Sequence, residues 1–192
     1  MVTSRRLSIH DHDPAWPQRF RRFASSLRAA VGAEALRLDH IGSTSVPGLA
    51  AKDVIDIQIT VEDLGVADRW PDELLSGLVR RAENIVDHIP NGASPDPAEW
   101  EKRYWSSSAD VHVHVRADGR ANQRYPLLFR DYLRDDPLAA RAYGAVKKAL
   151  AKLAQDDWDA YYEVKDPACD LIIAGAEQWA TRIGWTVPPS DA

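Results

Sequence analysis

Residues 39–61 have the sequence "DHIGSTSVPGLAAKDVIDIQITV", and this stretch decides the fold. Its second half alternates strictly, with one apolar side made of Ile55, Ile57, Ile59 and Val61. Side chains of a strand point alternately to opposite faces, so the pattern predicts a strand over residues 54–61. Asp56 and Gln58 then share its polar face. A Gly-Ser pair and a Pro-Gly turn precede the strand, and together they predict a loop that leads into it.

The composition indicates a globular protein that is not a general nucleic-acid binder. The chain has 192 residues, of which 45% are apolar and 28% charged, and we find no internal repeat or low-complexity run. This length suits a single domain over residues 1–192. The net charge of -5 argues against a broad nucleic-acid surface, because such surfaces are usually basic.

The same features predict a cytoplasmic protein that does not enter the membrane. The only cysteine, Cys169, excludes an internal disulfide and suits a reducing compartment. We interpret it as a small buried apolar residue because its surroundings, "ACDLIIAGA", are apolar. Residues 1–10 lack the apolar region of a signal peptide, and no apolar run approaches the length of a membrane span.

The order of predicted elements favours an α/β (α+β) fold, with a small mixed sheet and a helical C-terminal half. A helix should begin near Asp13 and Pro14 and end at Gly32, and a second should cover 71–82. Besides 54–61, strands are expected at 35–41, 84–89, 100–106 and 110–116. Helices follow from about 121, one beginning at Pro137 and the last spanning 167–183 with Asp166 as its cap. We expect the mixed part to cover about 13–120 and the helical part about 121–185 of one domain.

The Gly-Ser loop is the first candidate for ligand binding. Gly42 allows the backbone to approach a ligand closely or to adopt a positive φ. Ser43 and Thr44 add hydroxyl donors. If a helix begins here, its N–H groups and dipole favour a phosphate. The alternative is an ordinary turn in which Ser43 or Thr44 caps the next element.

Asp56 is the second candidate, as a ligand for a divalent cation. Two acids at positions i and i+2 of a strand share a face and can bridge metal ions that clamp phosphate oxygens. Gln58 replaces the second acid here. An amide oxygen can coordinate a metal but brings no charge, so Mg²⁺ would be held less firmly. The alternative is that Asp56 is a polar residue on a solvated strand face.

Residues 110–116, "DVHVHVR", place His112 and His114 on one strand face. Two such imidazoles can bind zinc, manganese or iron, or can contact phosphate. A complete metal site needs further ligands, which Asp56 would supply if this strand lies beside residues 54–61. Basic residues near the ends of predicted elements can neutralise phosphate or form surface ion pairs, and they include Lys52, Arg103, Arg130, Lys147 and Lys165.

Four segments in order resemble the GrpB family: "HIGSTSVPGLAAKDVIDIQITV", "VHVHV", "LLFRDYLRDDPLAARAYGAVKKALA" and "YYEVKDPACDLIIAGAEQWA". The resemblance extends from about Trp16 to Trp179. It implies a small bacterial protein with a polymerase-β-like nucleotidyltransferase fold. A similar domain is appended to actinobacterial dephospho-CoA kinase, but this chain has no GxxxxGK[ST] phosphate loop.

The resemblance also assigns residues to the elements of that fold, which are a Gly-Ser pair, an acid-x-acid pair on the next strand and a third acid on a neighbouring strand. Gly42 and Ser43 match the first element, and Asp56 matches the first acid. Gln58 departs from the second acid, and the strand with His112 and His114 stands in place of the third. Other recurring family positions are matched by Arg130, Asp131, Lys147 and Lys165. The Gln58 departure argues against ordinary two-magnesium transfer, because one carboxylate fewer weakens charge stabilisation.

Two hypotheses follow from these residues. In the first, the protein binds a nucleotide or another phosphorylated small molecule and transfers a nucleoside monophosphate with help from magnesium or manganese, zinc being the alternative metal. Asp56 and Ser43 would then be catalytic. The metal ligands would be Asp56, Gln58, His112 and His114, and the phosphate-binding residues Gly42, Ser43, Thr44, Lys52, Arg103, Lys147 and Lys165. In the second, the site is degenerate, and the domain binds a ligand without catalysis or acts as a folding helper for a protein partner.

Overall fold

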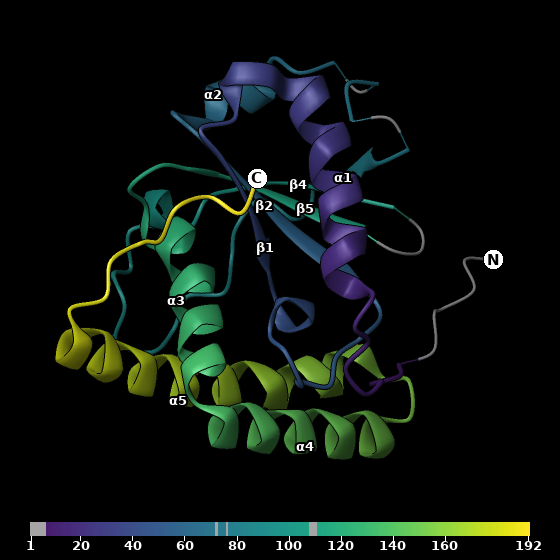
Figure 1. The fold of residues 1–192 in the computed structure, drawn as a ribbon, viewed down its shortest axis with the longest axis vertical. Coiled ribbons are helices and arrows are strands. Elements are labelled where there is room, and N and C mark those ends of the chain that lie inside the picture. The colour runs from purple at the N-terminus through teal and green to yellow at the C-terminus, as the bar shows by residue number, and fades with distance from the viewer. Residues whose placement is uncertain (1–6, 72, 76, 108–110) are drawn as a thin grey trace.

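The computed structural model describes residues 7–71, 73–75, 77–107 and 111–192 and contains a five-stranded mixed sheet (Figure 1). The strands are β1 (Arg37–Ile41), β2 (Ile55–Val61), β3 (Val79–Arg80), β4 (Arg103–Ser106) and β5 (Val111–Ala117). Their order across the sheet is β1-β2-β5-β4-β3. Only the central pair, β2 and β5, is parallel, and the other described neighbours are antiparallel. The predicted small mixed sheet is therefore confirmed.

The apolar face of the sheet packs against α1 (Trp16–Val31) and the short α2 (Leu64–Asp68). The alternating residues of β2 and β5 behave as their pattern predicts, because Ile57, Ile59 and Val113 are fully buried on this face. Full burial of one such side chain stabilises the fold by roughly 1.5–3 kcal/mol. Helix α1 ends at Gly32, which has a φ of 57°. This face therefore forms the main core and turns the polar residues of both strands to the other side.

Three helices make up the C-terminal half, as the sequence predicts. They are α3 (Ala121–Asp135), α4 (Pro137–Ala154) and α5 (Trp158–Ile183). Figure 1 shows α4 and α5 side by side at the bottom of the view, with α3 rising from them. Helix α4 begins at Pro137, and the side chain of Asp136 caps it by accepting from the N–H groups of Leu138 and Ala139.

Two predicted elements are wrong, and so is the predicted start of the last helix. The described residues of the 71–82 segment form turns and the short β3, with Gly77 at a φ of 81°, and the helix nearby is α2. The 84–89 segment forms one isolated bridge, from Val86 to Glu101, and no strand. Helix α5 begins at Trp158, with Asp157 as its cap, and it continues through Pro167. Proline removes one N–H donor, but buried residues on both sides of it, Tyr161 and Ile173, hold this helix in place.

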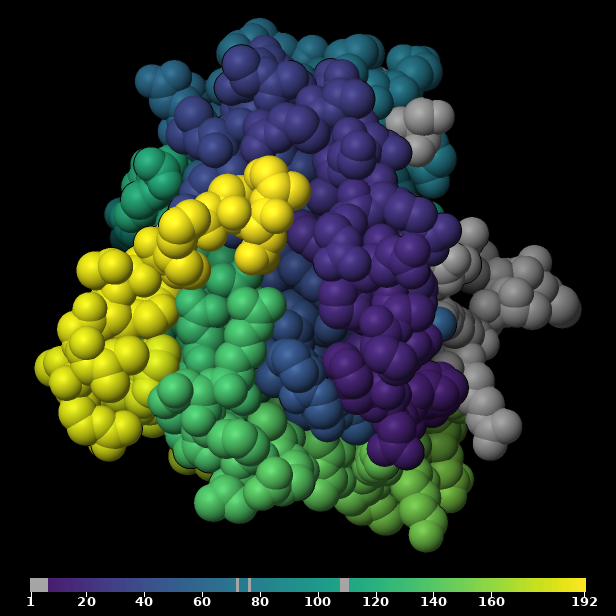
Figure 2. Space-filling view, in the orientation of Figure 1, coloured from purple at the N-terminus to yellow at the C-terminus, as the bar shows by residue number. Residues whose placement is uncertain are grey.

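The last residues of the chain cross the surface and cover the outer edge of β1. Figure 2 shows this segment, in yellow, reaching from the C-terminal half to the first helix. The Ser190 hydroxyl bonds both the N–H and the carbonyl of Leu38. The Asp191 carboxylate accepts from the N–H of His40 and from Arg130. The edge strand is thereby paired within the chain. No described helix is long and apolar enough to cross a membrane.

Candidate functional site

A cavity of about 600 Å³ opens beside the polar ends of β2 and β5 and reaches the C-terminal helices. The strands contribute Asp56, His112 and His114 to its wall, and the Gly-Ser loop contributes Gly42 and Ser43. The helices contribute aromatic and basic side chains, among them Tyr125, Phe129, Tyr143, Lys147, Tyr161 and Lys165. The volume lies within the 300–1,000 Å³ usual for small-molecule sites.

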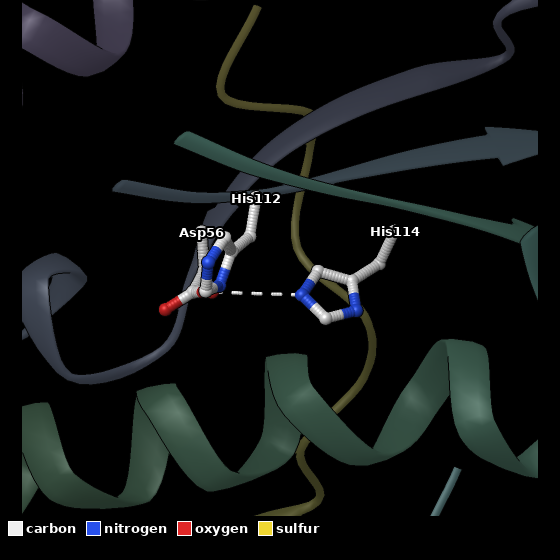
Figure 3. A group of neighbouring side chains, drawn as sticks. All are labelled: Asp56, His112 and His114. Atoms are coloured by element: carbon white, nitrogen blue, oxygen red, sulfur yellow. Dashed lines mark ion pairs between the residues drawn. The ribbon is translucent and has the colours of Figure 1, made fainter. Parts of the chain in front are cut away.

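Asp56, His112 and His114 converge because β2 and β5 are parallel neighbours. The register pairs Asp56 with His112 and Gln58 with His114. Figure 3 shows the three side chains on the same side of the strands. The Oδ1 atom of Asp56 lies 3.3 Å from His112 Nδ1 and 3.5 Å from His114 Nε2. One potential ligand atom from each residue lies within 4.8 Å of the other two, as a shared metal ion requires.

The protonation states of this cluster suit a cation. Burial would raise the pKa of Asp56, but hydrogen bonds with His112 and His114 outweigh it and hold that pKa well below its usual range. Burial lowers the pKa of His114 to about 4. At neutral pH Asp56 is therefore an anion and His114 a neutral imidazole, and these are the forms in which they bind metals.

The Gly42 position brings the loop against this carboxylate. Gly42 has a φ of 70°, and a Cβ atom there would lie 2.4 Å from Asp56 Oδ2. Only glycine fits both requirements. The residues that follow form a single 3₁₀ turn, Ser43–Ser45, and no longer helix. The dipole of a helix N-terminus is therefore not available here. The Thr44 hydroxyl donates to the Val54 carbonyl at 3.1 Å, which engages it in the fold.

Lys147 enters the cavity from α4 and reaches the same loop. Its Nζ donates to Ser43 Oγ at 2.7 Å and to the Ala50 carbonyl at 2.6 Å. The residue is 2% exposed. Burial, with the nearby charge of Lys165, lowers the pKa of Lys147 to about 7. Lys147 therefore loses its proton far more readily than an ordinary lysine does.

Two further lysines line the same end of the cavity. Lys165 on α5 forms an ion pair with Asp166 at 3.1 Å, and Lys52 donates to the Tyr162 hydroxyl at 2.9 Å. Burial lowers the pKa of Lys165, but Cys169 and Asp166 outweigh it, so the net pKa is raised. Lys165 is therefore charged at neutral pH, and this end of the cavity is basic.

Two residues expected at the site do not join it. The Gln58 side chain is fully buried, with its Nε2 on the Gln123 carbonyl and its Oε1 accepting from Arg116. Both ends of the amide are engaged away from Asp56, so Gln58 is not placed as a metal ligand. Arg103 pairs with Asp68 at 2.7 Å and Glu101 at 2.9 Å and lines a separate shallow pocket. It is therefore not placed to neutralise a phosphate in the cavity.

Sequence reasoning missed a second charged cluster on the cavity wall. Asp87 accepts from Lys102 at 2.7 Å, from Arg116 at 2.8 Å and from Asn122 at 3.1 Å. Arg116 could have been found, because it continues the alternation of His112 and His114. Asp87 carries no local sign of its role, since its partners lie on β5, α3 and the segment before β4.

The arrangement defines a nucleotidyltransferase-like class of fold with a basic, imidazole-containing cavity. A family model described as "GrpB protein" matches residues 6–174. The chain therefore belongs to the GrpB family. A solved structure of the conserved protein GrpB from Enterococcus faecalis is 29% identical, with a TM-score of 0.68, and the match covers 90% of this chain and 99% of that one.

Curated relatives fall into two groups. A dephospho-CoA kinase of Mycolicibacterium paratuberculosis is 42% identical over 189 residues, which are 90% of this chain and 46% of the kinase. The chain thus spans about half the length of such kinases, as the resemblance to their appended domain implies. A UPF0157 protein of Pseudomonas aeruginosa is 35% identical, with 89% of this chain and 68% of that protein covered. A UPF0157 protein of Streptomyces coelicolor is 34% identical, with 88% and 81% covered.

Proposed function

We propose that the protein binds a nucleotide or another phosphorylated small molecule together with a divalent cation, and that it transfers a nucleoside monophosphate to an acceptor. The observation that carries this proposal is the meeting of two groups in one cavity. One is the carboxylate–imidazole cluster of Asp56, His112 and His114. The other is the basic end formed by Lys52, Lys147 and Lys165.

The cluster favours a borderline cation over magnesium. Magnesium prefers oxygen ligands in an octahedral arrangement, whereas imidazole suits zinc, manganese and iron. Two of the three ligand groups at this site are imidazoles, and Gln58 is engaged elsewhere. This explains how the site dispenses with a second acid at position 58. A cation there would lower the cost of charge developing on a phosphoryl group.

The basic end suits the phosphates of the same ligand. Ser43 offers a hydroxyl, Lys165 offers an ammonium group, and Lys147 offers a further N–H donor on the cavity wall. Ammonium groups bind phosphate oxygens through charge-assisted hydrogen bonds. In the transfer reaction the chain would hold the triphosphate between this end and Asp56, so that a nucleophile attacks the α-phosphorus in line with the departing pyrophosphate.

Calorimetric titration tests the metal and the nucleotide separately. Tag-free protein is titrated with Zn²⁺, Mn²⁺ and Mg²⁺, and then with nucleoside triphosphates in the presence of each metal. We expect Zn²⁺ or Mn²⁺ to bind more tightly than Mg²⁺, and Asp56→Asn to weaken that binding by about 100-fold, in line with the effects of losing metal-site partners. Asp118→Asn, at an exposed position after β5, is the matched control.

The proposal fails if Asp56→Asn binds metal as tightly as the unmodified protein. It also fails if no nucleotide or sugar phosphate binds with any metal. In either case the non-catalytic role as a folding helper would be favoured. Thermal melts of both variants show whether the substitutions leave the fold intact.

A further inference from the structure

The Gly-Ser loop contains a serine and a buried lysine in direct contact. Lys147 Nζ lies 2.7 Å from Ser43 Oγ, and the Ala50 carbonyl, 2.6 Å from the same nitrogen, fixes its position. Ser43 is half-buried on the cavity wall, whereas Lys147 is 2% exposed. A serine becomes a nucleophile when a neighbouring base can take its proton, and lysine serves as that base in some enzymes.

We propose that Ser43 is a covalent nucleophile, with Lys147 as its general base, and that it accepts the nucleotidyl group before the final acceptor does. This proposal rests on the proposed function and deepens it. The Ser43 Oγ bonds to the α-phosphorus of a nucleoside triphosphate while the bond from that phosphorus to the bridging oxygen breaks. Pyrophosphate leaves, and the hydroxyl proton moves to Lys147 Nζ. A hydroxyl compound or water then attacks the same phosphorus, and the bond from phosphorus to Ser43 Oγ breaks. Lys147 returns its proton to Ser43 Oγ, and the proton of the acceptor hydroxyl passes to solvent.

The geometry around Lys147 favours a role as the general base for Ser43 over a role in which it only binds phosphate. One hydrogen of a neutral amine can remain on the Ala50 carbonyl, and the nitrogen lone pair can then accept from Ser43. The surroundings make the neutral form accessible, since burial and the positive charge of Lys165 lower the pKa of Lys147 to about 7. The centroid of the Tyr143 ring lies 4.4 Å from Lys147 Nζ.

The charges around Ser43 and Lys147 indicate which kind of group Ser43 would attack. Lys147 is influenced by Lys165 and Cys169 from α5, by Lys52 from the loop before β2, and by Asp56 from β2. Lys52 and Lys165 line the same cavity as Ser43. Two neighbouring ammonium groups suit an anionic phosphoryl centre better than a neutral ester, because they stabilise charge that develops on phosphoryl oxygens.

An alkyl fluorophosphonate tests the pair without metal or nucleotide. Attack by Ser43 forms the oxygen–phosphorus bond, breaks the phosphorus–fluorine bond and releases fluoride, while Lys147 takes the proton. We expect stoichiometric labelling that peptide mass spectrometry maps to Ser43, with a rate that rises between pH 6 and 8 as Lys147 becomes neutral. Ser43→Ala should abolish the label, and Ser45→Ala should retain it.

The Lys147→Arg variant tests whether Lys147 acts as a general base or only supplies a positive charge. Arginine keeps the positive charge but does not accept a proton at these pH values, so we expect labelling to slow by at least about 100-fold, the usual contribution of a general base. Lys148→Arg, at the exposed neighbouring position that pairs with Asp11, is the matched control and should label normally. Thermal melts confirm that each variant is folded.

Four results would overturn the inference or part of it. No labelling at Ser43 in folded protein overturns the nucleophile, and equal labelling in Lys147→Arg overturns the base. Nucleotide binding by calorimetry without any labelling would remove the Ser43–Lys147 pair alone and leave the proposed function. Labelling in a protein that binds no nucleoside triphosphate would overturn the nucleotide assignment and leave the pair.

Discussion

Two carboxylates on the wall of one cavity have opposite surroundings. Asp87 contacts two cations, Lys102 and Arg116, so its charge is compensated within the chain. The ion-pair partners of Asp56 among the described residues are imidazoles, and burial keeps His114 neutral at pH 7. The Asp87 cluster is therefore complete, whereas the Asp56 cluster retains a negative charge that a bound cation would neutralise.

The difference shows how to separate a structural ion pair from a binding site. When one partner of a buried ion pair is removed, the charge of the other partner is left uncompensated, and the fold is strongly destabilised. A carboxylate that contacts imidazoles and no permanent cation keeps its negative charge, and its coordinating atoms face the cavity. Both clusters lie beside the same two strands, so the chemistry of their partners distinguishes them better than their location does.

The largest expected effect comes from removing the compensated carboxylate. Asp87→Ala leaves Arg116, which is 5% exposed, and Lys102, which is 9% exposed, without their shared partner. We expect the free energy of unfolding to fall by about 3–5 kcal/mol, as for other broken buried pairs. Urea denaturation measures it, with Asp118→Ala as the exposed control. A loss below about 1 kcal/mol would show that the two carboxylates do not differ in this way.

The second expected effect is a dependence of stability on pH that separates the buried histidines from the carboxylates. Burial lowers the pKa of His114 to about 4, against about 6.5 in an unfolded chain. The unfolded chain therefore binds the proton more readily, so stability is full above pH 6.5 and falls as the pH approaches 4. His40, whose pKa burial also lowers to about 4, adds to this fall.

The Asp87 cluster responds only at lower pH. Burial would raise the pKa of Asp87, but Arg116 outweighs it and holds that pKa well below its usual range. Its contribution is present above about pH 4 and is lost as the pH falls toward the lowered folded value. Urea denaturation at pH 7, 5.5, 4.5 and 3.5 with a metal chelator should show both phases. His114→Gln should reduce the loss of stability between pH 6.5 and pH 4 by up to about 3 kcal/mol. A free energy of unfolding that does not change with pH above pH 4 would contradict the prediction.

The smallest effect is expected at an exposed ion pair of the same sheet. Asp68 pairs with Arg80 and Arg103, and its side chain is 39% exposed. Hydrogen bonds from Arg103 lower the pKa of Asp68 to about 2, but solvent screens such pairs. Asp68→Asn should cost less than about 1 kcal/mol in urea denaturation. A loss as large as that of Asp87→Ala would mean that exposure does not separate these ion pairs.

Local sequence patterns were sufficient to predict several helices and strands. The alternation in β2 and β5 depends on neighbouring residues alone, as does the start of α4 at Asp136 and Pro137. The same patterns failed where distant contacts compete with local preference. Helix α5 continues through Pro167 because packed residues on both sides hold it. In the leucine-rich segment 71–82, the described residues bury Leu75 against the core without forming a helix.

The sequence by itself determined which side chains share a face: Asp56 with Gln58 on one strand, and His112 with His114 on the other. Only the tertiary structure decided that β2 and β5 lie side by side and parallel, which brings Asp56 to both imidazoles. It also decided that Gln58 bonds Arg116 and that Lys147 reaches Ser43. The physical reason is range, because alternation is set by adjacent residues, whereas the partner of a polar side chain is set by burial of apolar surface far along the chain.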